Sequence, residues 1–157
     1  MRDIGYICTS TNQTQEIDMV NKSFDMIYCA AIGDSAAIRC IVDLGIADEE
    51  TMRFSLLQCG IDGNTQKHST IVRILTRAGV DPNTRGSYGW TPLHWAARHG
   101  HTRTAKALLE AGADPFIADE HGTRPIDFAQ SGAEFGFGKP RKNFQKIVDM
   151  MIDSQNK

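Results

Sequence analysis

A charge bias and long hydrophobic runs are both missing from this sequence of 157 residues. Its 17 lysines and arginines nearly balance its 19 aspartates and glutamates, so the formal net charge is −2. Binding to a nucleic-acid backbone usually requires a clustered excess of basic residues, so this balance argues against nucleic acid as a partner. The longest apolar run, residues 26–32, is too short for a membrane span or for the core of a secretory signal. We therefore expect a cytoplasmic protein without a membrane partner, with the nucleus as an alternative compartment.

Cysteine is scarce, and no two of the four cysteines form a CxxC pair. They are Cys8, Cys29, Cys40 and Cys59, and the rest of the chain after Cys59 contains none. Their number permits a disulfide framework, but a chain of this length can bury a core without covalent cross-links. We expect reduced and mostly buried thiols, which behave as small hydrophobic side chains.

A repeat with a period of 33 runs along the chain. Gly89, Pro92, Leu93 and Ala96 are matched at an offset of 33 by Gly122, Pro125, Ile126 and Ala129. An earlier copy, residues 29–45, matches residues 96–112 at an offset of 67, which is two periods and one inserted residue. The period predicts four units at about residues 24–46, 50–79, 86–112 and 119–152. They form a repeat domain over residues 21–157 that follows an N-terminal extension, residues 1–20.

The third unit indicates a pair of short helices. Thr91 is a good N-cap, and Pro92 suits the first helical position, where its missing N–H has no cost. Gly100 is expected to end this helix, and a second helix is expected from about residue 102 to a left-handed cap at Gly112. Its apolar positions follow one face at helical spacing: Ala105, Leu108 and Leu109. Such a pair cannot bury its apolar face alone and must stack on neighbouring copies.

This third unit resembles an ankyrin repeat through its whole length. The resemblance rests on Gly89-x-Thr91-Pro92-Leu93-His94-x-Ala96-Ala97-x-x-Gly100-His101, continued by Leu108-Leu109-x-x-Gly112-Ala113-Asp114. It is strong in this unit, good in the fourth up to Ala129 and weaker in the first two. It implies an all-α ankyrin-repeat solenoid of about four stacked helix-turn-helix units with β-turn fingers.

The departures from the family pattern are local. The third unit has Gly86 where the family usually has an aspartate before the turn, whereas the fourth unit keeps Asp119. The second unit lacks the Thr-Pro-Leu-His box, and residues 60–64 are expected to form a longer connection between its helices. In the fourth unit, residues 132–142 are expected to form an insertion. A last helix then follows, with an apolar face of Phe144, Ile147, Val148 and Met151.

Histidines and a glycine-rich stretch raise the question of a metal or catalytic site. His94 belongs to the Thr-Pro-Leu-His box, where the resemblance implies a structural hydrogen bond between adjacent repeats, and His101 is expected to cap or pack. The stretch 136–140 lacks the pattern of a phosphate loop, since Ala133 and Pro140 stand where glycine and serine or threonine are needed. We therefore expect no enzyme activity, no metal and no cofactor.

The resemblance also implies a groove, lined by finger tips and first helices, that holds a partner. Carried over residue by residue, its variable positions are Arg85, Ser87, Tyr88, Trp90, Arg98, His99, Ala118, Glu120, His121, Thr123 and Ser131. Tyrosine, tryptophan and arginine dominate interface hot spots. Trp90 is interpreted as a binding residue, and packing on the neighbouring finger is the alternative. Trp95 is expected to be largely buried.

The sequence thus predicts a non-catalytic interaction module or adaptor. It is expected to be a monomer that binds another protein and no small-molecule substrate. Two alternatives remain. One is a scaffold that carries a metal or enzymatic site. The other is a weak nucleic-acid binder that uses the basic residues Lys139, Arg141 and Lys142.

Overall fold

The computed structural model describes residues 22–136 and 138–154. Within these ranges the chain forms eight α-helices, one short 3₁₀ helix and no strand. The elements in chain order are α1 (Lys22–Ile32), α2 (Ser35–Asp43), α3 (Glu49–Asp62), α4 (Gln66–Arg77), η1 (Ser87–Gly89), α5 (Pro92–His99), α6 (Thr102–Glu110), α7 (Pro125–Phe135) and α8 (Arg141–Asp153). The N-terminal extension expected over residues 1–20 lies outside the described residues.

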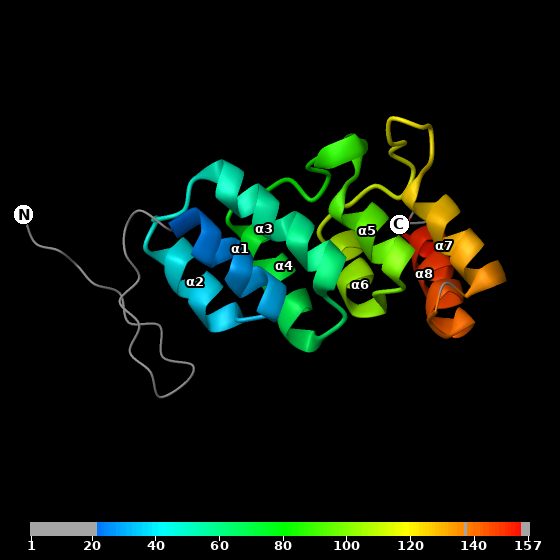
Figure 1. Ribbon diagram of the computed structural model, residues 1–157, viewed down its shortest axis with the longest axis horizontal. Coiled ribbons are helices and arrows are strands. Elements are labelled where there is room, and N and C mark those ends of the chain that lie inside the picture. The colour runs from blue at the N-terminus through cyan, green and yellow to red at the C-terminus, as the bar shows by residue number, and fades with distance from the viewer. Residues whose placement is uncertain (1–21, 137, 155–157) are drawn as a thin grey trace, which may run out of the picture.

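The helices stack as four pairs in two rows. One row contains α1, α3, α5 and α7, each in contact with the next, and the other row contains α2, α4, α6 and α8 (Figure 1). Each pair packs mainly on its neighbours and not around a central point, as expected of a repeat array. The predicted all-α solenoid of stacked helix pairs is therefore confirmed.

The predicted signals of the third unit are all present. Pro92 is the first residue of α5, and the backbone N–H of Thr91 donates to His94 Nδ1 over 3.0 Å. Gly100 ends α5 with φ at +67°, the left-handed region that favours glycine. The helix α6 begins at Thr102, and Gly112 follows it with φ at +93°.

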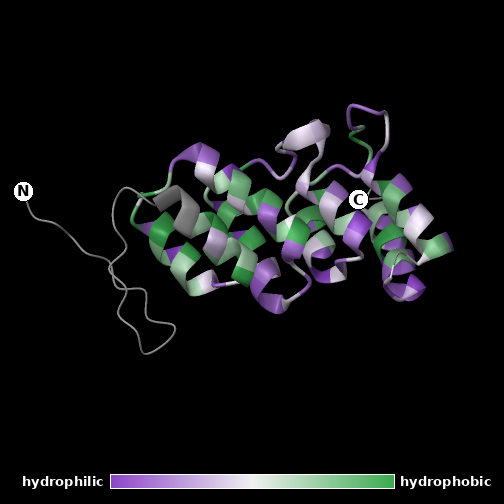
Figure 2. Ribbon diagram, viewed as in Figure 1, coloured by the Kyte–Doolittle hydropathy of each residue, from purple (hydrophilic) through white to green (hydrophobic). Residues whose placement is uncertain are grey.

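The core is a seam between the two helix rows and not a single central cluster. Apolar residues recur in every helix along the array, and Figure 2 shows them as green bands. Its largest fully buried apolar side chains include Met26, Ile38, Leu56, Ile71, Leu75, Leu93, Leu108, Phe144, Ile147 and Met151. All four apolar positions predicted for the last helix are buried.

The longer connection expected over residues 60–64 is not formed. The helix α3 continues through Gly60 to Asp62, and Thr65 already caps α4. Gly60 lies inside the helix, and α5 approaches it so closely that a Cβ there would lie 2.5 Å from the Pro92 carbonyl oxygen. This glycine permits close helix packing and does not make a turn.

The insertion expected over residues 132–142 is shorter than predicted, and its first glycine also lies inside a helix. The helix α7 runs through Gly132 to Phe135, and only residues 136–140 connect it to α8. A Cβ on Gly132 would overlap the ring of Phe144, which packs against α7 from α8. The chain turns at Gly136, where φ is +84°.

The cysteines within the described residues differ in exposure. Cys59 is buried and Cys29 is half-buried, whereas Cys40 is exposed. Burial, with a further contribution from Asp62, raises the pKa of the Cys59 thiol. The expectation of mostly buried thiols is therefore wrong for Cys40.

Candidate functional site

Two chain reversals project from the same edge of the helix array as fingers (Figure 1). The first finger (residues 84–90) is closed by the Gly86 N–H, which donates to the Trp90 carbonyl over 2.8 Å. The second finger (residues 118–123) is closed by the Asp119 N–H, which donates to the Thr123 carbonyl over 2.9 Å. Both fingers lead directly into helices of the same row, α5 and α7.

The tip of the first finger holds Tyr88 outward. Tyr88 has φ at +61° and Gly89 has φ at +72°, two successive positive values, as in a type I′ turn. This conformation is uncommon for a tyrosine and leaves 64% of the residue exposed. Backbone strain of this kind is concentrated at functional sites, which makes the tip a candidate contact.

Three hydrogen bonds tie the two fingers together. Arg85 Nη1 donates to the Ala118 carbonyl over 3.1 Å, and the Glu120 N–H donates to the Tyr88 carbonyl over 3.1 Å. The third bond runs from Trp90 Nε1 to Asp119 Oδ2 over 2.9 Å. The fingers therefore form one preorganised surface.

The buried Asp119 carboxylate organises the second finger from within. Its Oδ1 accepts the N–H groups of His121 and Thr123 over 2.8 and 2.9 Å. Burial opposes ionisation, but these two N–H donors and the Trp90 indole outweigh it and hold the pKa of Asp119 below its usual range. Asp119 is thus a charged structural residue.

Trp90 lies at the centre of an aromatic cluster between the first finger, α5 and α7. Its ring centroid lies 4.4 Å from that of Trp95 and 4.8 Å from that of Phe128, in tilted geometry. Trp95 stacks in turn on His99, with centroids 6.0 Å apart. These four half-buried side chains form a continuous surface, here called the aromatic strip (Trp90, Trp95, His99 and Phe128).

One cation sits over the aromatic strip. The guanidinium carbon of Arg98 lies 5.8 Å from the centroid of Trp90 and 6.0 Å from that of Phe128. Both distances are within the range of cation–π attraction. Arg98 is on the last turn of α5 and is exposed to solvent.

The structure brings the predicted surface residues together on the fingers and α5. The exposed ones are Arg85, Ser87, Tyr88, Arg98, Ala118, Glu120 and His121, and the half-buried ones are Trp90, His99, Thr123 and, on α7, Ser131. Trp90 packs on the neighbouring finger, as the alternative interpretation held, and still keeps part of its surface exposed.

Two residues of the aromatic strip were misjudged or missed from the sequence. Trp95 is expected to be largely buried, but it is only half-buried, although its Cβ packs closely over Gly60 of α3. Phe128 was not singled out. The repeat contained the signal, since Phe128 follows Trp95 at an offset of 33 and so shares its place on the helix.

His94 and His101 have structural roles. His94 Nε2 donates to the Thr123 carbonyl of the next unit over 3.2 Å, which confirms the predicted bond between repeats. His101 Nδ1 bonds the Gly60 carbonyl of the preceding unit over 3.0 Å. Burial is the main cause that lowers the pKa of both imidazoles, so both are held neutral.

Metal ligands are not grouped in the part of the chain that the structure describes. No three histidine, cysteine, aspartate or glutamate side chains there are placed to share an ion. None of the described helices combines the length and apolarity of a membrane span.

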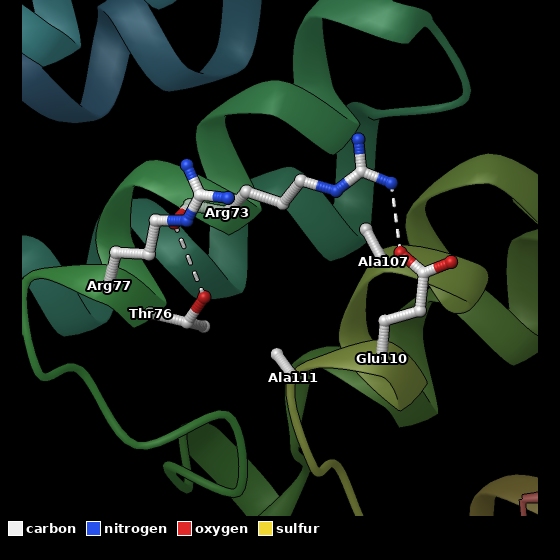
Figure 3. Close-up of a pocket in the computed structure, with 6 residues that line it drawn as sticks. All are labelled: Arg73, Thr76, Arg77, Ala107, Glu110 and Ala111. Atoms are coloured by element: carbon white, nitrogen blue, oxygen red, sulfur yellow. Dashed lines mark hydrogen bonds and ion pairs between the residues drawn. The ribbon is translucent and has the colours of Figure 1, made fainter.

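A shallow depression between α4 and α6 is a second surface feature. It is lined by Arg73, Thr76, Arg77, Ala107, Glu110 and Ala111. Figure 3 shows Arg73 extending from α4 to Glu110 on α6, where its Nη2 lies 2.8 Å from Glu110 Oε2. This exposed ion pair closes one side of the depression, and the small side chains of Ala107 and Ala111 offer few anchors for a ligand.

The basic residues Lys139, Arg141 and Lys142 are exposed at the start of α8 and in the turn before it. They form a small surface cluster. A cluster of this size, in a chain with a net charge of −2, gives little support to nucleic-acid binding.

Comparison with known proteins gives one family and several relatives. The family model described as Ankyrin repeat matches residues 88–120, which include the first finger's tip, α5 and α6. Cyclin-dependent kinase 4 inhibitor B from Bos taurus is 30% identical over 109 residues, which cover 68% of this chain and 80% of that protein.

Two further relatives are much longer. A palmitoyltransferase from Lachancea kluyveri is 36% identical over 96 residues, which cover 57% of this chain but only 13% of the enzyme. The mouse Ankyrin repeat, SAM and basic leucine zipper domain-containing protein 1 is 27% identical over 81 residues, which cover 50% of this chain and 17% of that protein. The chain thus spans less than a fifth of the length of either.

Proposed function

Because the chain belongs to the ankyrin repeat family, whose repeats bind protein partners, we propose that it is an adaptor that binds another protein through the fingers and the aromatic strip. The bovine relative supports this, since its name describes it as an inhibitor of a kinase. The observation that carries the proposal is the interlocked pair of fingers, which holds Tyr88 outward beside the half-exposed aromatic strip.

The geometry suits a hot spot. Aromatic side chains supply large contact areas for little loss of conformational entropy, and here the hydrogen bonds between the fingers fix them before a partner arrives. The neighbouring Arg98 and His99 add polar reach at the same place. A partner would bury an apolar centre surrounded by polar finger tips, the usual anatomy of a protein interface.

We propose no catalytic activity for the chain. The similarity to the palmitoyltransferase covers only 13% of that enzyme, whereas the bovine inhibitor is covered over 80% of its length. We also propose that the chain acts as a monomer, which sedimentation equilibrium at working concentration would test.

Tyr88→Asn tests the proposed surface. Asparagine tolerates the left-handed backbone of this position, so the finger should keep its shape while losing the aromatic contact. Affinity capture from the source cells, followed by quantitative mass spectrometry, should show partners that the wild type retains and Tyr88→Asn loses by at least tenfold.

The matched control is Leu44→Ser, which removes an exposed apolar side chain at the end of α2. It should retain the same partners, and both variants should melt like the wild type by circular dichroism. If Tyr88→Asn retains every partner, or if both variants lose the same ones, the proposed surface is wrong.

A further inference from the structure

Arg98 differs from the other arginines of the described residues in its setting. It lies over two aromatic rings, yet the ion pairs found within residues 22–136 and 138–154 engage Arg73, Lys106 and Arg124 and do not include it. A guanidinium has five N–H donors in a planar fork that matches a carboxylate. The two rings lie against this guanidinium, and the residue is exposed to solvent.

Two carboxylates that act on residues of the aromatic strip, Asp119 and Asp62, hydrogen-bond to groups other than Arg98. Asp119 accepts three N–H donors, including that of Trp90. Asp62, at the end of α3, accepts a hydrogen bond from the side-chain amide of Gln58. Neither acid forms an ion pair with Arg98 among the described residues, although the charge of Asp62 acts on His99 in the sense opposite to those of Arg98 and Lys139.

The charge of a second cation also acts at the His99 end of the strip. Lys139 precedes α8, and its charge acts on His99 and on His101. Burial first, and then the charges of Arg98 and Lys139, lower the pKa of His99. The two imidazoles stack with centroids 5.5 Å apart, and both have a lowered pKa, so their neutral forms are favoured.

We propose that the partner docks an acidic segment here, with an aspartate or glutamate on Arg98 and an adjacent aromatic or aliphatic side chain against Trp95 and Phe128. This inference rests on the proposed function and names the chemistry of the partner at that same surface. A charge-assisted bidentate bond at a site shielded by aromatic rings is stronger than an exposed ion pair.

The alternative ligand for these rings is a methylated ammonium group, which aromatic cages bind. Arg98 already occupies the cation position over Trp90 and Phe128, so an incoming cation would meet a like charge. The geometry therefore favours an anion on the partner.

A random peptide library displayed on phage and panned against the whole chain tests this proposal. Peptides selected by the wild type should be enriched in aspartate or glutamate next to an aromatic or aliphatic residue. Arg98→Glu should reverse the preference toward lysine and arginine. The matched control, Arg77→Glu, changes an exposed arginine on α4 in the other helix row and should select the same peptides as the wild type.

Affinity gives the second measurement. The best wild-type peptide should bind Arg98→Glu at least tenfold more weakly, and Arg77→Glu within twofold of the wild type. Wild-type peptides rich in lysine, or binding of a trimethyl-lysine peptide that Arg98→Glu strengthens, would overturn the acidic partner.

The outcomes also separate this inference from the proposed function. If neutral apolar peptides bind and Tyr88→Asn abolishes their binding, the acidic chemistry is wrong and the proposed surface stands. If the library yields no peptide that depends on Tyr88 or Arg98, both are wrong.

Discussion

Trp90 is the residue on which the link between the two fingers depends. Its indole N–H donates to the buried Asp119 carboxylate, and its ring contacts Trp95 and Phe128. Trp90 therefore both stabilises the fingers and forms part of the candidate surface. Its loss would disturb both, which is why Tyr88 is the better position for testing binding.

Trp90→Phe should destabilise the fold by about 1–3 kcal/mol, because the aromatic packing is largely kept while a buried carboxylate loses a hydrogen bond. Urea denaturation followed by circular dichroism measures the change. Trp95→Phe is the matched control, because it makes the same reduction in ring size at a tryptophan whose N–H has no acceptor among the described residues. It should lower the free energy of unfolding clearly less than Trp90→Phe does. Equal losses in the two variants would show that the bond to Asp119 contributes nothing.

Glycines show how far single residues could be understood from the sequence. Gly100 and Gly112 were predicted as helix caps, because a glycine after an amphipathic run signals a left-handed residue. Gly60 and Gly132 look the same in sequence but lie inside α3 and α7, where another element leaves no room for a Cβ. Only the packing distinguishes the two uses.

At the scale of elements, the unit formed by α5 and α6 is held to its neighbours by two buried imidazoles. His94 bonds the Thr123 carbonyl on one side, and His101 bonds the Gly60 carbonyl on the other. Both have pKa values lowered mainly by burial, so the folded unit disfavours their protonated forms.

The stability of the fold should therefore fall as the pH drops below about 6.5, the ordinary pKa of histidine. Below pH 6.5 the histidines of the unfolded chain bind protons, whereas the same histidines in the folded unit stay neutral. Their contribution to the free energy of unfolding is therefore complete above pH 6.5 and is lost as the pH falls toward their pKa in the folded unit. The free energy of unfolding in urea, measured between pH 7.5 and 5, should decrease by at most about 1.4 kcal/mol per pH unit for each histidine.

His94→Asn and His101→Asn should each flatten this slope while lowering stability at pH 7.5. A slope that is unchanged in both variants would assign the pH dependence to other groups.

The fingers were predicted as elements, but the contacts within them were not. The resemblance to an ankyrin repeat placed Tyr88, Trp90 and Glu120 at the finger turns, and the structure has them there. The bonds from Arg85 to Ala118 and from Trp90 to Asp119 join residues 33 and 29 positions apart. Such pairs depend on how adjacent repeats stack, which spacing alone does not give.

At the scale of the whole molecule, the two rows of helices have different roles. In the row of α1, α3, α5 and α7, the last two helices follow the fingers and carry most of the aromatic strip, while the row of α2, α4, α6 and α8 closes the core from the other side (Figure 1). Since the net charge is only −2, long-range steering should be weak. Recognition should depend on local shape, on the aromatic strip and on Arg98.

Hydrogen exchange of the chain with and without a captured partner tests the central claim most directly, because it reports which segments become protected. The adaptor surface predicts protection in the fingers, residues 84–90 and 118–123, and in α5 and α7. The helices α2, α4, α6 and α8 should exchange as they do in the unbound chain. Protection confined to those four helices, with unchanged exchange in the fingers, would contradict the account.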